Sequence, residues 1–445
     1  MPPPSSLTAL ADGPLDRSLV SGAVPAVLLV LGLCALTALC CSRDRAWWRR
    51  RAPAAVLLAG GLTYLATAAV DDWWRPFPDP LPLGVVSWLG IAVLGVLLAL
   101  GRLPGLRPWG RTGAVVAAAL VLLTSLSQVN RHYDQYPTLR AVPGPWTPRT
   151  VDLARAAGAR APALEVPAGK ALSQVWRPPA GLPRRGTLSR VAFPATASGY
   201  RARDGLVYLP PAYQASPRPL LPVLLLIPGQ PGGPDDYLQS GRLVATMDRF
   251  AAGHRGLAPV VVVADANGSQ FANHLCMDSR LGRAQTYLAR DVPHWVRAHL
   301  QTAAGPARWA VSGYSFGGTC SLQLAVNAPR VFGRFIDISG QDEPTLGDHG
   351  RTVRAAFGAD RAAFARVDPV RVMARTRFPD TAGVFVAGTG DDRYGPQQRR
   401  VYAAARHSGM DATFVPLSGG HGWQVWRPGL VTQLPWLARR TGLIP

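Results

Sequence analysis

One serine in this sequence stands in a setting that activates serine hydroxyls. The run Gly313-Tyr314-Ser315-Phe316-Gly317 matches the pattern G-x-S-x-G. An apolar stretch that predicts a strand leads into this run, and a stretch that predicts a helix follows it at once. A strand, a tight turn and a helix around this pattern make a nucleophile elbow, whose small residues accommodate a strained serine backbone. We therefore expect Ser315 to be a nucleophile; the alternative is an idle serine at a glycine-rich helix start.

A serine nucleophile needs a general base, and the base needs an acid that orients it. In the fold that uses this elbow, the acid and then the base follow the serine in the chain. His421 lies in a loop of small residues after the last predicted strand, so its imidazole can swing over the nucleophile. His407 lies near a predicted helix C-terminus, where it suits the helix dipole, and His349 comes too early in the chain. His421 is the predicted base.

The acid is expected at the end of the predicted strand 383–391, just before the predicted helix 393–409. Residues 388–392, Gly-Thr-Gly-Asp-Asp, end a predicted strand and offer two adjacent carboxylates. Asp391 is the predicted acid and Asp392 is the alternative. The carboxylate that is not used would cap the helix that follows.

The reaction on Ser315 develops an oxyanion, which backbone N–H groups must stabilise. One expected donor is the N–H of Phe316, directly after the nucleophile. The other lies in the loop that follows the predicted strand 221–229, where we expect the backbone N–H of Gln230 to serve. The side chain of Gln230 need not take part.

These residues require a scaffold, and the chain from residue 187 predicts one in which strands and helices alternate. Predicted strands cover residues 187–195, 205–213, 221–229, 258–267, 307–315, 332–340, 383–391 and 411–420, and predicted helices cover 283–300, 316–328, 393–409 and about 430–440. Several of the strands are continuous apolar runs, which is typical of strands buried on both faces. The pattern predicts an α/β-hydrolase fold, a mainly parallel sheet flanked by helices, with the site at the carboxyl ends of the strands.

Four long apolar stretches without charge precede this region. They cover residues 21–42, 52–70, 81–101 and 112–128. Each is close to the roughly 20 residues that cross a bilayer as a helix. Charged residues make up only 16% of the chain, which also indicates that part of it lies in lipid. A cleaved signal peptide is the rival interpretation of the first stretch, but the long tail before it is not basic and three more stretches follow. We predict a four-helix transmembrane region.

The loops between the apolar stretches predict their orientation. Arginines gather in the first and third loops, whereas the second loop is acidic. These arginines are Arg43, Arg45, Arg49, Arg50, Arg51, Arg102, Arg107 and Arg111. Positive loops stay on the cytoplasmic side, so everything after residue 130 is expected outside the cytoplasm. No ionisable residue lies in the middle of a stretch, which favours an anchor over a transporter.

The formal net charge of +21 invites a nucleic-acid interpretation, which the pattern of charges excludes. The basic residues are scattered, and no reader motif is present. Contact with anionic lipid or wall polymer explains the positive charge better than nucleic-acid binding does. No spacing predicts a metal site, and no cofactor is expected. In the part expected outside the cytoplasm, Cys276 and Cys320 are predicted to form a disulfide, with two buried thiols as the alternative.

The predicted organisation has four parts. Residues 1–18 form a tail, 19–130 the four-span anchor, 131–185 an extracytoplasmic linker rich in Pro, Ala, Gly and Arg, and 186–445 the hydrolase domain.

The motifs together resemble a known family. They are GYSFGGTCSLQLA, the PGQPGGPDDY loop, the segment Cys276–Ser279 with the following TYLARDVPHW, and GGHGW. They resemble the putative-esterase group, which includes esterase D-like enzymes and mycobacterial mycolyltransferases, over about residues 186–430. The resemblance implies the same nucleophile, acid, base and oxyanion donors as those chosen above. Mycolyltransferases are secreted and use a glutamate as the acid, so this chain is more similar to polytopic actinobacterial esterase-like proteins.

The sequence thus predicts a membrane-anchored, outward-facing serine ester hydrolase or acyltransferase that forms an acyl-serine intermediate. Its expected partners are the membrane and a small-molecule or lipid ester, without nucleic acid. One rival hypothesis is a catalytically silent hydrolase-like module that binds envelope lipid or polysaccharide. The other is a transporter, which would require ionisable or broken positions inside the spans.

Overall fold

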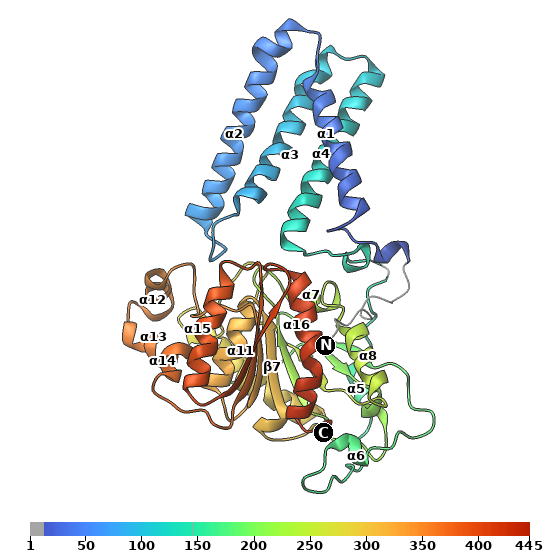
Figure 1. The fold of residues 1–445 in the computed structure, drawn as a ribbon, viewed down its shortest axis with the longest axis vertical. Coiled ribbons are helices and arrows are strands. Elements are labelled where there is room, and N and C mark those ends of the chain that lie inside the picture. Colours follow the sequence, from blue (N-terminus) through green and yellow to red (C-terminus); the bar gives the residue numbers. More distant parts are fainter. Residues whose placement is uncertain (1–12, 145) are drawn as a thin grey trace. The chain divides into compact units, whose positions relative to one another are not determined.

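The protein divides into two compact units, Met1–Pro145 and Trp146–Pro445. The computed structural model describes residues 13–144 and 146–445. Figure 1 shows long helices in the first unit and a sheet covered by helices in the second.

The first unit is built from four helices that are long and apolar enough to cross a membrane. They are α1 (Ala23–Cys40), α2 (Ala52–Ala68), α3 (Leu83–Arg102) and α4 (Pro108–Tyr133), and π-helical turns extend α2 to Trp47–Trp74. Small residues allow close packing against α4: a Cβ on Gly32 would lie 2.1 Å from Oγ1 of Thr124, and one on Gly95 would lie 2.7 Å from Cγ1 of Val121. Close approach at small residues is how helices associate where lipid removes the hydrophobic driving force.

The second unit contains an eight-stranded sheet with the order β1-β2-β4-β3-β7-β8-β9-β10. The strands are β1 (Thr187–Val191), β2 (Gly205–Leu209), β3 (Val223–Ile227), β4 (Val260–Val263), β7 (Trp309–Tyr314), β8 (Arg334–Ile338), β9 (Ala382–Gly388) and β10 (Asp411–Leu417). The strands from β4 to β10 in this order run parallel, whereas β1 and β2 are antiparallel additions at one edge. A separate short hairpin joins β5 (Asp278–Ser279) to β6 (Gly282–Arg283).

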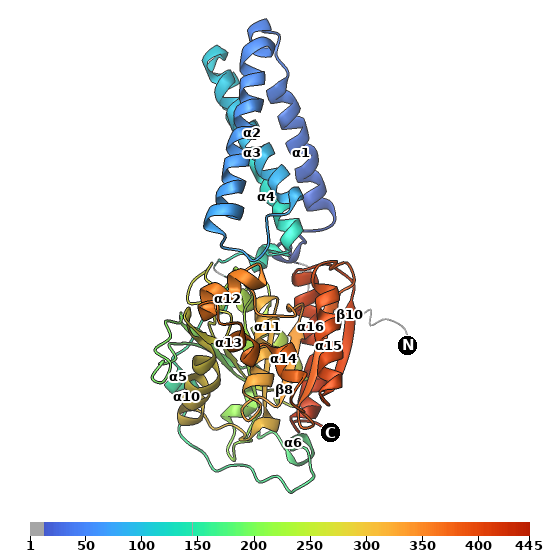
Figure 2. The ribbon, with the colours of Figure 1, turned by 90° about the vertical axis from the view of Figure 1, so that its left-hand side faces the viewer.

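Helices cover both faces of the sheet, so its central strands are buried on both sides. One face packs against α8 (Leu243–Gly253) and α16 (Trp423–Arg440). The other packs against α10 (Val292–His299), α11 (Phe316–Asn327) and α15 (Tyr394–His407). In Figure 1, α11 and α15 lie on one side of β7 and α16 lies on the other, and Figure 2 looks onto the α11 and α15 side. The α/β-hydrolase fold predicted from the sequence is confirmed.

Three helices that follow β8 were not predicted. They are α12 (His349–Phe357), α13 (Arg361–Val367) and α14 (Pro369–Met373). Each begins at an aspartate whose side chain accepts a backbone N–H of the first turn, as N-cap residues do.

Residues 146–185, here called the N-terminal segment, pack onto the second unit although they contain little regular structure. Their helices are the short α5 (Leu153–Ala157) and α6 (Leu172–Val175). Trp176 is buried, and its indole N–H donates to the carbonyl of Arg255 at 2.9 Å. The N–H of Leu172 donates to the carbonyl of Gly442 at 3.0 Å, which ties the beginning of this unit to its end.

A disulfide links Cys276, in the connection between β4 and β5, to Cys320 on α11. Both residues are fully buried, and their Cα atoms are 5.5 Å apart. Closing a loop over a sequence separation of 44 residues restricts the unfolded chain and stabilises the fold by about 4 kcal/mol in the chain-entropy account.

The double variant Cys276→Ala/Cys320→Ala is therefore expected to lower the midpoint of thermal unfolding of the detergent-solubilised full chain by several degrees. The exposed free cysteine Cys41 supplies the matched control, Cys41→Ala, which should leave the midpoint unchanged. Equal midpoints for the double variant and the control would show that the disulfide does not stabilise the protein.

Candidate active site

Ser315 occupies a sharp turn between β7 and α11, with φ 54° and ψ −122°. Positive φ at a non-glycine residue costs about 1–3 kcal/mol and persists only where the surroundings enforce it. Here the N–H of Ser315 donates to the carbonyl of Ile338 at 2.8 Å. Glycines make room on both sides, because a Cβ on Gly317 would lie 2.0 Å from the carbonyl oxygen of Ile227 and one on Gly313 would lie 2.3 Å from the carbonyl oxygen of Gly317. The turn therefore presents the serine hydroxyl at the carboxyl end of the central strand.

The serine hydroxyl meets a histidine and a buried carboxylate in one chain of hydrogen bonds. Nε2 of His421 lies 2.9 Å from Oγ of Ser315, and Nδ1 of His421 lies 2.8 Å from Oδ2 of Asp391. The Asp391 side chain is almost wholly buried, and its second oxygen, Oδ1, accepts the N–H of Tyr394 at 2.9 Å. One carboxylate thus caps the start of α15 and orients the imidazole. Asp392 is exposed, and it is Asp391 that contacts the histidine.

The other candidate histidines lie elsewhere. Nδ1 of His349 lies 3.0 Å from Oε2 of Glu343, and its side chain is exposed. His407 is the last residue of α15.

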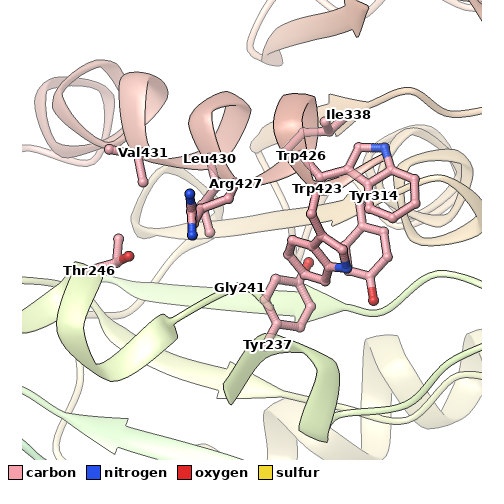
Figure 3. Close-up of a pocket in the computed structure, with 10 residues that line it drawn as sticks. All are labelled: Tyr237, Gly241, Thr246, Tyr314, Ile338, Trp423, Trp426, Arg427, Leu430 and Val431. Atoms are coloured by element: carbon pink, nitrogen blue, oxygen red, sulfur yellow. The ribbon is translucent and has the colours of Figure 1, made fainter. Parts of the chain in front are cut away.

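Aromatic side chains surround the imidazole of His421. The ring of Tyr394 lies 4.2 Å from it between centroids, and Trp426 meets it edge-on at 5.2 Å. Trp426 stacks in turn on Tyr314, the residue before Ser315, at 4.6 Å. Trp426 and Tyr314 also line a cavity of about 10 Å³, and Figure 3 shows their rings together with those of Tyr237 and Trp423. The contacts of Tyr394 and Trp426 with the imidazole restrict the orientations that it can adopt.

The two predicted oxyanion donors lie after neighbouring strands, since β3 and β7 pair in parallel. Phe316 is the first residue of α11, where backbone N–H groups have no partner within the helix. Gln230 follows β3, and its side-chain Nε2 donates to the carbonyl of Phe271 at 2.9 Å while its Oε1 accepts from Nδ2 of Asn273 at 3.4 Å. Its side chain is thus bound to the 271–273 segment.

Two side chains to which the sequence analysis gave no role donate to the loop that carries Gln230. They are Arg203, which donates to the carbonyl of Gly232, and Asn267, which donates to the carbonyl of Gly229. Asp265 in turn accepts from the guanidinium of Arg203. Among the described residues, no group of three or more His, Cys, Asp and Glu side chains could hold a metal ion.

A buried carboxylate lies beneath the elbow. Asp337 on β8 is fully buried, and its Oδ1 accepts the N–H of Gly340 at 3.0 Å. A Cβ on Gly318, in the first turn of α11, would lie only 2.5 Å from that oxygen. Burial raises the pKa of Asp337 from 3.8 to about 7, because the charged form is removed from water.

This shift predicts a pH dependence of stability. The folded state holds the proton of Asp337 at pH values where the unfolded state has released it, so the contribution of this group is greatest below pH 3.8 and is lost as the pH rises to about 7. Asp337→Asn keeps a neutral side chain at every pH. Between about pH 4 and pH 7 the wild type should lose the contribution of Asp337, and the variant should not. We therefore expect the thermal midpoint of Asp337→Asn, minus that of the wild type, to become more positive over this range.

The exposed Asp392→Asn provides the control for this series, measured on the full chain in the same detergent. A difference between Asp337→Asn and wild type that stays constant with pH would contradict the raised pKa.

Comparison with known proteins agrees with this architecture. The family model described as Putative esterase matches residues 198–437. An uncharacterized protein of Corynebacterium glutamicum is 35% identical over 412 residues, which cover 90% of this chain and 92% of that protein. A ferulic acid esterase of known structure matches with a TM-score of 0.50 at 16% identity, covering 59% of this chain and 100% of that chain. An S-formylglutathione hydrolase from Agrobacterium tumefaciens matches with a TM-score of 0.48 at 18% identity, covering 58% and 97%. This chain belongs to the putative esterase family of α/β-hydrolases.

Proposed function

We propose that this protein is a membrane-anchored serine ester hydrolase that works outside the cytoplasm through an acyl-serine intermediate. The observation that carries the proposal is the continuous hydrogen-bonded chain from Ser315 through His421 to Asp391, with separations of 2.9 and 2.8 Å. A base within hydrogen-bond reach of a nucleophile, itself oriented by a third group, is the arrangement that activates serine.

In the acylation step, Oγ of Ser315 attacks the ester carbonyl while Nε2 of His421 takes its proton. Asp391 accepts the Nδ1–H of His421 throughout and stabilises the imidazolium that forms. The backbone N–H groups of Phe316 and Gln230 donate hydrogen bonds to the former carbonyl oxygen and stabilise its negative charge. As the intermediate collapses, the imidazolium returns the proton to the departing alcohol.

In the deacylation step, His421 takes a proton from water, and the resulting hydroxyl attacks the acyl-serine carbonyl. The carboxylic acid leaves as Ser315 regains its proton. A hydroxyl of an acceptor molecule in place of water would give the acyltransferase form of the same reaction.

The four apolar helices support an anchor for this activity. Their arginine-rich connections, α1 to α2 and α3 to α4, belong on the cytoplasmic side. The catalytic unit follows the opposite end of α4, and this order of elements supports its location outside the cytoplasm. A disulfide between Cys276 and Cys320 suits an oxidising compartment, which supports the same location.

The direct test is covalent labelling of the purified full chain with a fluorophosphonate probe, followed by mass spectrometry of the labelled peptide. We expect one label, on Ser315, together with hydrolysis of p-nitrophenyl acetate that the label abolishes. A heat-denatured sample is the control for non-specific reaction. A folded protein that takes no label, or takes it on another residue, would favour the catalytically silent binding module over the enzyme.

A further inference from the structure

The loop that carries the second oxyanion donor is held on both sides of that donor by side chains that the mechanism above does not use. Residues 228–234 are called here the oxyanion loop. The side-chain amide of Asn267 donates from Nδ2 to the carbonyl of Gly229 at 3.1 Å. The guanidinium of Arg203 donates from Nη2 to the carbonyl of Gly232 at 2.7 Å. These carbonyls lie one residue before and two residues after the donor residue, so the two hydrogen bonds fix the backbone that brackets it.

One buried carboxylate binds both of these residues, Arg203 through its side chain and backbone and Asn267 through its backbone. Asp265, two residues after β4, is fully buried and accepts five N–H hydrogen bonds. Three come from Arg203, through its backbone N–H at 2.8 Å, Nε at 3.1 Å and Nη2 at 2.8 Å. The others come from the backbone N–H groups of Asn267 at 3.1 Å and Gly268 at 3.0 Å. A buried charge is tolerated when it is paired and hydrogen-bonded in this way, and its partners are then fixed in place.

The support runs from the end of a central strand to a loop rich in glycine. β4 pairs in parallel with β3, so the carboxyl end of β4 lies beside the point where the oxyanion loop begins. The loop contains Gly229, Gly232 and Gly233, and glycine backbones are not confined by their own side chains. Oxyanion stabilisation requires donors that are already aimed before the charge develops, and a misplacement of about 1 Å costs about 100-fold in rate.

We infer that Asp265, Arg203 and Asn267 are positioning residues that hold the oxyanion loop in its catalytic geometry. The inference rests on the proposed function, because the loop matters in this sense only if an oxyanion forms. The three side chains act on the reaction through the loop backbone.

Two variants weaken the support while they leave Asp265 in place. Arg203→Lys keeps a positive charge beside Asp265 but loses the planar fork that contacts the carboxylate and the carbonyl of Gly232 together. Asn267→Ala removes the side-chain amide and keeps the backbone N–H. Each is expected to lower kcat for p-nitrophenyl acetate about 10- to 100-fold, with KM unchanged. The midpoint of the pH dependence of kcat/KM should stay at its wild-type value, because His421 and its acid are untouched.

The measurement separates positioning from partial unfolding. Fluorophosphonate titration carried to completion counts the competent sites, and kcat is expressed per titrated site. The matched control is Asn327→Ala, which removes the same kind of hydrogen bond, from Nδ2 to the carbonyl of Val367 at 2.9 Å, at the far end of α11 from the nucleophile. It should leave kcat per site unchanged.

Hydrogen exchange of the full chain gives a readout that does not depend on turnover. Peptides that cover the oxyanion loop should exchange faster in Arg203→Lys and Asn267→Ala than in the wild type, and at the wild-type rate in Asn327→Ala. Unchanged exchange, or faster exchange with wild-type kcat per site, would overturn the inference. A wild type that neither takes the label nor hydrolyses the ester would instead overturn the proposed function, and the catalytic role of these residues with it.

Discussion

His421→Ala is expected to lower kcat for ester hydrolysis by about 10⁶-fold, the loss that follows removal of one indispensable member of a catalytic triad. The variant removes the nitrogen that lies 2.9 Å from Oγ of Ser315 and would take its proton, and with it the acid that would protonate the departing alcohol. Because the two residues act as a unit, the double variant Ser315→Ala/His421→Ala should be no slower than either single variant. The measurement is steady-state hydrolysis of p-nitrophenyl acetate by the purified full chain.

His407→Ala serves as the matched control for the loss of an imidazole, because His407 ends α15 and does not contact Ser315. It should retain the wild-type kcat. If His421→Ala kept a substantial part of the activity, or if the losses of the two single variants multiplied in the double variant, the proposed base would be wrong.

Asp391→Asn is expected to lower kcat by about 10⁴-fold, whereas Asp392→Asn is expected to leave it unchanged. An amide in place of the carboxylate no longer holds the tautomer in which Nε2 of His421 accepts the serine proton. The amide oxygen can still accept the N–H of Tyr394, so the start of α15 and the fold should be preserved.

Both aspartate variants are compared by kcat per titrated site and by thermal midpoint. Equal losses in the two variants would mean that the tandem carboxylates share the role, and a larger loss in Asp392→Asn would reverse the assignment. A large loss in Asp391→Asn with a wild-type midpoint would assign the effect to the orientation of the base.

The sheet was predictable because its strands carry a strong local signal. Runs such as Leu-Leu-Leu-Ile before the oxyanion loop and Val-Val-Val-Val in β4 are typical of strands buried on both faces, and the alternation with helices specifies the parallel order. Ser315 and His421 were predictable as a pair because small residues flank both of them in the sequence. A tight turn needs such residues around the serine, and a histidine in a loop after the last strand can approach it. The sequence could not decide between Asp391 and Asp392 as the acid. The two residues stand in the same turn, and only the folded backbone determines which side chain points toward His421.

Other features were missed for different physical reasons. Helix α8 was missed although the sequence contains a signal for it. Its buried residues Leu243, Met247 and Ala251 stand at intervals of four, which is typical of the buried face of a helix. The role of Asp265 depends on Arg203, more than 60 residues away in the chain, and a single sequence contains no signal for such a pairing. An aspartate two residues after a fully apolar strand was nevertheless a hint, because a charge buried at the end of an inner strand needs partners.

The N-terminal segment has a consequence for the order in which the protein is made. The hydrogen bond from the N–H of Leu172 reaches the carbonyl of Gly442, 270 residues later in the chain, at 3.0 Å. The neighbouring N–H of Ser173 reaches Leu443 in the same way, at 2.9 Å. Domains fold as the chain emerges during synthesis, but these two hydrogen bonds cannot form until residues 442 and 443 have been made. A chain cut short before Gly442 would therefore keep all four long helices but leave Leu172 and Ser173 without these two backbone partners.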